Sequence, residues 1–176
     1  MFKYKNSPGF SLLEMMIAIT LMSIISGLLL SIIAVNFKLI SDVSDRKKLV
    51  TRGMLAINLF QREFGMLQHT DDILVATSSQ LKFTDAYGNT WDYTISGNFL
   101  NREEVGGGAG ALSLATPIQN AGTAFSYYAE DNSIAGSIAQ IRLVKLMLVM
   151  DDGSDGIALM SIVYPENMKI YNYPLD

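Results

Sequence analysis

The feature that most constrains the fold of this chain is a run of 23 residues without any charge, from Met15 to Phe37. As a helix, the run would be about 35 Å long at ~1.5 Å per residue, enough to cross a hydrocarbon core of about 30 Å. A buried core helix is usually shorter and amphipathic. A secretory signal peptide has a shorter apolar stretch and a small-residue cleavage site, and residues 34–37 contain no A-x-A pattern. The run therefore predicts a membrane-spanning helix that the protein retains.

The segment before this run is short and polar. Lys3 and Lys5 lie in this segment, and a Pro-Gly pair then breaks the chain. Ser11 and Glu14 have the three-residue spacing of a capping box. Glu14 is also the only charged residue between Lys5 and Lys38. A carboxylate at the edge of a membrane span is costly without a partner, and the span contains no basic residue that could pair with it.

The segment from Gly9 to Met22, GFSLLEMMIAITLM, resembles the class III signal of type IV prepilins and type II secretion pseudopilins. The resemblance implies that a membrane peptidase cuts after Gly9 and methylates the new amine on Phe10. The glutamate at the fifth mature position, Glu14 here, then serves subunit assembly. The expected partners are the prepilin peptidase and methyltransferase, other pilins or pseudopilins, and an inner-membrane assembly platform.

The resemblance therefore implies a structural protein without catalytic activity of its own, since a separate ATPase drives assembly in that family. The expected function is that of a minor pilin or minor pseudopilin in a type IV pilus or type II secretion pseudopilus. The alternative is a membrane-anchored periplasmic protein whose head captures a protein or surface ligand. Both readings imply a single pass through a bacterial inner membrane, with the head in the periplasm or outside.

Charge counting opposes this orientation. The positive-inside rule compares basic residues close to the two ends of a span. The leader offers Lys3, Lys5 and the first amine, whereas the far side offers more: Lys38, Arg46, Lys47, Lys48 and Arg52. The expected orientation consequently rests on the resemblance.

The helical pattern continues beyond the expected membrane. Apolar residues follow steps of three and four as far as Leu67, and no proline interrupts residues 10–68. We therefore expect a leader at 1–9, a membrane-spanning and filament-core helix at 10–37, and an amphipathic soluble helix at 38–68. A head of antiparallel strands is expected at 69–176.

The pattern in the head changes to a period of two. Strands are predicted at 81–85, 90–96, 98–105, 123–131, 137–152 and 156–166, and the last two form the strongest hairpin. The stretch 106–122 is expected to be mostly loop. The predicted fold class is α+β, with the long helix packed against an antiparallel sheet. The resemblance identifies this layout as the pilin fold.

A second, shorter resemblance lies within the head. The segment 93–102, YTISGNFLNR, resembles a strand pair of J-type minor pseudopilins and W-type minor pilins. The chain contains no cysteine, whereas many major pilins close a C-terminal loop with a disulfide. Both observations favour a minor subunit over a major one.

Catalytic patterns are scarce in this sequence. The lack of cysteine excludes thiol catalysis, iron–sulfur ligation and cysteine-based zinc sites. His69 is the only histidine, and it is interpreted as a surface residue at a helix end. Glu103 and Glu104 would alternate between faces of a strand, which disfavours a paired-carboxylate site. The glycines at 106–110 lack a following Lys-Ser/Thr and predict a flexible loop.

One loop carries a metal hypothesis. In DDGSDG, Asp151 and Asp155 match positions one and five of a calcium loop, and Gly156 matches position six. Position twelve is Ile162, where such a loop needs glutamate. A hairpin turn is therefore favoured, calcium binding at these two aspartates is the alternative, and no other cofactor is expected.

Charge is divided unevenly along the chain. Residues 38–68 carry a net charge of +3, and residues 69–176 carry −8. The acidic head disfavours nucleic acid as a partner. The head is nevertheless poor in charge, so that part of its apolar surface is expected to pack on neighbouring subunits. The apolar residues considered for buried surface are Tyr127, Tyr128, Leu146, Met147 and Met150.

Overall fold

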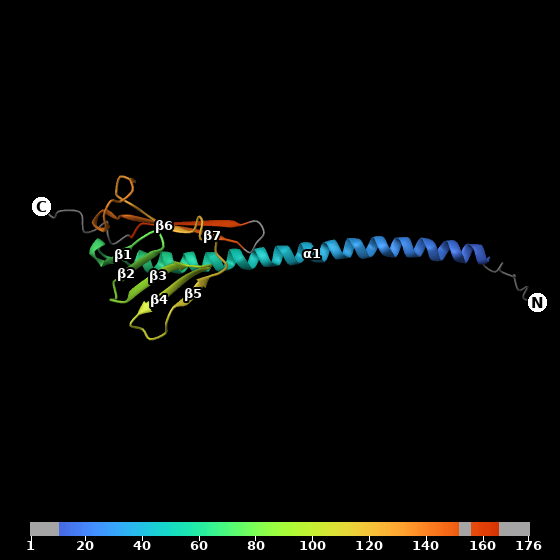
Figure 1. Cartoon of the computed structure of the whole chain (residues 1–176), viewed down its shortest axis with the longest axis horizontal. Coiled ribbons are helices and arrows are strands. Elements are labelled where there is room, and N and C mark those ends of the chain that lie inside the picture. Colours follow the sequence, from blue (N-terminus) through green and yellow to red (C-terminus); the bar gives the residue numbers. More distant parts are fainter. Residues whose placement is uncertain (1–10, 152–155, 166–176) are drawn as a thin grey trace, which may run out of the picture. The chain divides into compact units, whose positions relative to one another are not determined.

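The computed structural model of this chain describes residues 11–151 and 156–165. One long helix, α1 (Leu12–Gly65), is followed by strands that are all antiparallel in the described residues. The predicted α+β class is therefore confirmed (Figure 1). The chain divides into two compact units, Met1–Arg46 and Lys47–Asp176.

The first unit is the N-terminal part of α1. Ser11 caps it, because its hydroxyl accepts a hydrogen bond of 3.3 Å from the backbone N–H of Glu14. Every described residue of this unit is exposed. The hydroxyls of Thr20 and Ser23 donate to backbone carbonyls of the preceding turn, so that neither needs water. The helix is long and apolar enough to cross a membrane, and none of its most apolar window is buried inside the protein.

In the second unit, α1 ends earlier than predicted. The last helical residue is Gly65, whereas the predicted soluble helix extends to residue 68. The backbone N–H groups of Met66 and Leu67 bond three residues back, which tightens the turn and buries the side chain of Leu67. The expected border between the membrane and soluble parts of the helix, between residues 37 and 38, stays a prediction.

His69 is exposed, as predicted, but it caps a short helix that was not predicted from the sequence. It precedes the 3-10 helix Thr70–Asp72, and its Nδ1 accepts a hydrogen bond of 3.2 Å from the backbone N–H of Asp71. The carboxylate of Asp72 accepts in turn from the backbone N–H of His69. These reciprocal bonds turn the chain from α1 towards the first strand.

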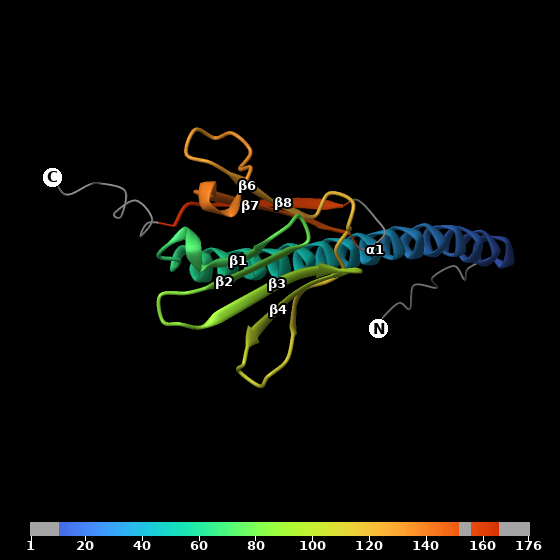
Figure 2. The same cartoon turned by 60° about the vertical axis from the view of Figure 1, so that its left-hand side comes forward.

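Two sheets follow, where one was predicted. The first is a five-stranded meander in chain order, formed by β1 (Ile73–Ala76), β2 (Gln80–Thr84), β3 (Thr90–Ser96), β4 (Phe99–Val105) and β5 (Leu112–Ala115). The second contains β6 (Ala124–Tyr128), β7 (Leu143–Met150) and β8 (Ile157–Val163) in that order. Figure 2 shows the two sheets as separate groups of strands.

The strand predictions at β2, β3, β4, β6 and the β7–β8 hairpin are confirmed. Strands β1 and β5 were not predicted, because each is only four residues long. The strand expected from residue 137 begins only at Leu143, after the 3-10 helix Ile138–Gln140. Pairing with β2 and β4, respectively, stabilises the two short strands, and this pairing is not visible in their own residues.

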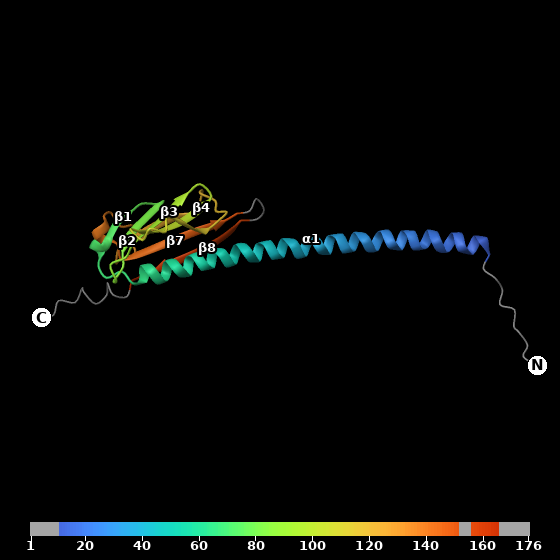
Figure 3. The same ribbon diagram turned by 90° about the horizontal axis from the view of Figure 1, so that it is seen from below.

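One aromatic cluster joins the helix to both sheets. Phe60 of α1 lies 5.4 Å from Tyr93 of β3 and 5.9 Å from Phe125 of β6, measured between ring centroids. Phe64 lies 5.2 Å from Phe83 of β2. In Figure 1 the C-terminal part of α1 runs between the two sheets, and in Figure 3 the strands lie on one side of it. One face of this helical segment is therefore buried.

Gly53 lets β8 approach this buried face. A Cβ atom at Gly53 would meet the side chain of Leu159 and would lie 3.3 Å from Met150. Leu146 and Met150 are themselves fully buried in the core of this chain. Both were considered for buried surface from the sequence, and the fold of this chain alone buries them.

Candidate functional site

The N-terminal site expected from the sequence is described only in part. Gly9 and Phe10 lie outside the described residues. Glu14 lies in the first turn of α1 and is exposed. Among the residues that the structure describes, its carboxylate forms no hydrogen bond or ion pair. The assignments of Gly9, Phe10 and Glu14 remain predictions.

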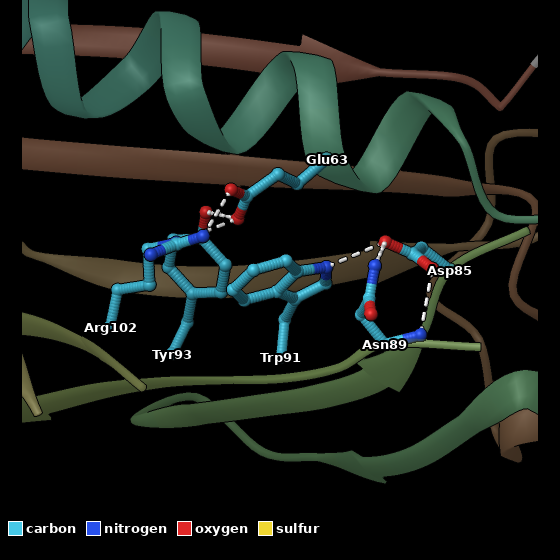
Figure 4. Close-up of polar contacts among 6 residues, drawn as sticks. All are labelled: Glu63, Asp85, Asn89, Trp91, Tyr93 and Arg102. Atoms are coloured by element: carbon cyan, nitrogen blue, oxygen red, sulfur yellow. Dashed lines mark hydrogen bonds and ion pairs between the residues drawn. The ribbon is translucent and has the colours of Figure 1, made fainter. Parts of the chain in front are cut away.

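The most developed polar site of the described chain lies in the head, between α1 and the first sheet (Figure 4). Its central residue is Glu63, which projects from the buried face of α1 and is only 4% exposed. The hydroxyl of Tyr93 donates to Glu63 Oε2 at 2.5 Å. Arg102 donates through Nε to Oε2 at 2.9 Å and through Nη2 to Oε1 at 2.6 Å. A bidentate arginine–carboxylate pair thus joins the helix to the sheet.

Strand register brings the two donors together. Tyr93 and Arg102 are directly opposite each other on β3 and β4, and their side chains therefore lie on the same face of the sheet. Both belong to the segment 93–102 that suggested a minor subunit. In this chain, the tyrosine and the arginine of that segment bind one carboxylate from the helix.

A second carboxylate extends the site along the sheet. The guanidinium carbon of Arg102 lies 3.8 Å from the ring centroid of Trp91, a cation–π contact. Trp91 Nε1 donates to Asp85 Oδ2 at 2.9 Å. The Asp85 carboxylate also accepts from the backbone N–H groups of Tyr87 and Asn89, which closes the turn between β2 and β3. We call Glu63, Asp85, Trp91, Tyr93 and Arg102 the Glu63 cluster.

Burial and hydrogen bonding shift the pKa values of this cluster. Burial raises the pKa of Tyr93, and the neighbouring Glu63 carboxylate raises it further. Burial alone would lower the pKa of Arg102, but the hydrogen bonds and charge of Glu63 outweigh burial and raise it. Burial alone would also raise the pKa of Asp85, whereas its hydrogen bonds from Trp91, Asn89 and Tyr87 lower it. Tyr93 is thereby held neutral, whereas Arg102 and Asp85 are held charged.

The cluster is suited to holding the fold together. Each of its polar groups has a partner, and no side chain in it is poised as a nucleophile. The sequence analysis missed the role of Glu63. The sequence did contain a signal for it. Glu63 is a charged residue on the same helical face as Ala56 and Phe60, where an apolar residue is expected.

The calcium hypothesis stays untested. Asp151 follows β7, and its backbone N–H donates to Pro117 O at 3.2 Å. Asp155 lies outside the described residues. Within residues 11–151 and 156–165, no group of three or more His, Cys, Asp or Glu side chains is arranged to hold a metal ion.

Comparison with known families finds a match at the N-terminus. Residues 4–30 match the family described as the prokaryotic N-terminal methylation motif. This range includes Gly9, Phe10, Glu14 and the first part of the apolar run. Neither the curated proteins nor the solved structures yield a match to this chain.

Proposed function

We propose that this chain, which carries a type IV pilin-like prepilin signal, is a minor pilin or minor pseudopilin. In this proposal it is cut after Gly9, methylated on Phe10 and assembled into a filament based in the inner membrane. The observation that carries the proposal is the methylation motif at residues 4–30. The motif implies processing by a prepilin peptidase and assembly with other pilins.

The long helix supports this function. The motif and the apolar N-terminal helix fit a membrane-anchored, single-pass protein. All its described residues up to Arg46 are exposed, so that this apolar surface needs lipid or other helices to cover it. A membrane covers it before assembly, and the equivalent helices of neighbouring subunits cover it in a filament.

Glu14 is proposed to set the register between subunits. Cleavage after Gly9 would expose an α-amine on Phe10, and the Glu14 carboxylate of a neighbouring subunit would meet it. In an apolar filament core, such an ion pair is favoured over two unpaired charges. Because the desolvation of both groups offsets much of their attraction, we assign the pair to alignment more than to net stability.

The processing step is tested by mass spectrometry of the N-terminus. The full chain is expressed with a prepilin peptidase, alongside a Gly9→Val variant. The unmodified chain should begin at a methylated Phe10, and the variant should keep its leader. A Gly9→Val variant that is cut normally, or an unmodified chain that keeps residues 1–9, would contradict the assignment.

The assembly step is tested with Glu14→Ala in the native cells. This variant should still be inserted and cleaved, but its amount in sheared filaments should fall about tenfold, because the Phe10 amine would be left buried without a partner. Met15→Ala, which changes the adjacent residue of the same exposed turn, serves as the matched control. Normal incorporation of Glu14→Ala into filaments would contradict the register hypothesis. A chain recovered only from membranes, never from filaments, would instead favour a membrane-anchored binding protein.

A further inference from the structure

The second sheet is apolar on both of its faces. On β7, Val144, Leu146, Leu148 and Met150 point into the core, so the residues between them point outwards. Strand register continues this outward surface onto β8. We call it the outer β7–β8 face, and its six residues are Lys145, Met147, Val149, Ala158, Met160 and Ile162.

Much of this face is accessible. Met160 is 58% exposed and Ile162 is 51% exposed. The two lie on the same side of β8, with Met160 opposite Met147 and Ile162 opposite Lys145. In an antiparallel sheet with one face in water, polar residues commonly alternate with apolar ones along each strand. The outer β7–β8 face therefore has the composition of a covered surface.

The first sheet provides an internal comparison. Along β2 and β3 its outer face is polar, and several groups there pair with one another. At its ends β4 adds two exposed apolar residues, Phe99 and Val105. Gln80 Nε2 donates to both carboxylate oxygens of Asp92, at 2.9 and 3.0 Å, and Lys82 lies 3.9 Å from the same carboxylate. The hydroxyls of Thr84 and Thr90 are 3.2 Å apart. The paired polar groups along β2 and β3 suit a face in water, whereas the outer β7–β8 face has apolar residues at five of its six positions.

The single charge on the face indicates what covers it. In the described part of the chain, the Lys145 ammonium pairs with no carboxylate, and it lies 6.0 Å from the ring centroid of Tyr128. Burying it under a partner would be costly unless the partner supplies an anion. Two copies of this same face would bring two lysines together, which disfavours a symmetric pair. An anionic lipid surface is disfavoured because the region 69–176 carries a net charge of −8.

We propose that the outer β7–β8 face docks a neighbouring filament subunit through an apolar surface that places one carboxylate against Lys145. The proposal rests on the filament function proposed above. Met160 and Ile162 form the apolar part of the contact, and Lys145 selects the partner by its charge. Met147, which was considered for buried surface from the sequence, lies opposite Met160.

Incorporation into filaments tests the docking. Met160→Asp places a charge in the proposed contact, and Lys145→Glu reverses the selecting charge. The matched control is Ser96→Asp, which adds the same charge to an exposed position on the outer face of β3. Both test variants should be cleaved and folded, with Trp91 fluorescence unchanged, but their amount in filaments should fall about tenfold or more. Ser96→Asp should be incorporated like the unmodified chain.

Cysteine labelling gives a second readout, because the chain has no cysteine of its own. A maleimide should label Met160→Cys in membranes but not in filaments, and should label Ser96→Cys in both. A carbodiimide, which condenses an amine and a carboxylate into an amide with loss of water, should link Lys145 to an aspartate or glutamate of another subunit.

The outcomes distinguish a wrong docking surface from a wrong filament function. If Met160→Asp is incorporated normally, or if Met160→Cys is labelled equally in both fractions, the docking surface is wrong while the filament function stands. Protection of Met160→Cys already in membranes would overturn the proposal in favour of a lipid surface. If neither the unmodified chain nor Ser96→Asp enters filaments, the proposed function itself fails.

Discussion

Replacing Glu63 with alanine should destabilise the head by about 3 kcal/mol. The carboxylate is nearly fully buried and accepts three hydrogen bonds, from Tyr93 and Arg102. Its removal leaves a buried phenol without an acceptor and a guanidinium without its counter-ion. Breaking a buried ion pair costs about 3–5 kcal/mol. We place this one at the lower end, because the Arg102 side chain is 18% exposed and keeps some contact with water.

Urea unfolding of the full chain in detergent would measure this loss. Trp91 is the only tryptophan, is 8% exposed, and lies against Arg102, so its fluorescence reports on the head. For a slope of about 2 kcal/mol per molar urea, a loss of 3 kcal/mol should lower the midpoint by about 1.5 M. The slope of the unfolding free energy against urea concentration should be the same for the unmodified chain and for Glu63→Ala, if both unfold in the same way.

Two further variants make the result interpretable. Lys82→Met breaks the pair between Lys82 and Asp92 on the outer face of the first sheet, and it should cost less than about 1 kcal/mol. The double variant Glu63→Met with Arg102→Met removes both charges, and it should recover part of the lost stability, because the Tyr93 hydroxyl still lacks its acceptor. A loss below about 1 kcal/mol for Glu63→Ala would refute the view that this pair joins the helix to the sheet.

Two other predictions use the same assay. Gly53→Val should destabilise the head by about 2 kcal/mol, because the new side chain would collide with Leu159, whereas Gly65→Ala has open space and should show no such loss. The pKa of Asp85 is lower in the folded head than in the unfolded chain, despite the opposing effect of burial. Its contribution to stability is therefore complete above about pH 4 and is lost as the pH falls through the folded-state pKa. The urea midpoint of the unmodified chain should fall below about pH 4, and Asp85→Asn should make this fall less steep. An equally steep fall in Asp85→Asn would show that other groups cause it.

Local patterns predicted the elements that depend on local physics. The absence of charge between Met15 and Phe37 was sufficient for a long apolar helix, since helical hydrogen bonds form within the segment itself. The β3–β4 hairpin was predictable because Gly97 occupies its turn, where the backbone has a φ of +55°. The same reasoning did not predict β1 and β5, whose positions depend on their neighbours.

The sequence by itself determined the membrane-type helix, the processing motif and the α+β class of the head, because each depends on composition or on periodicity over a short stretch. Only the tertiary structure decided that the head has two sheets, that Glu63 binds Tyr93 and Arg102, and that the outer β7–β8 face is apolar. Glu63 is separated from its two partners by 30 and 39 residues. Side chains that far apart meet only when the helix and strands pack, and a one-dimensional pattern does not specify that packing.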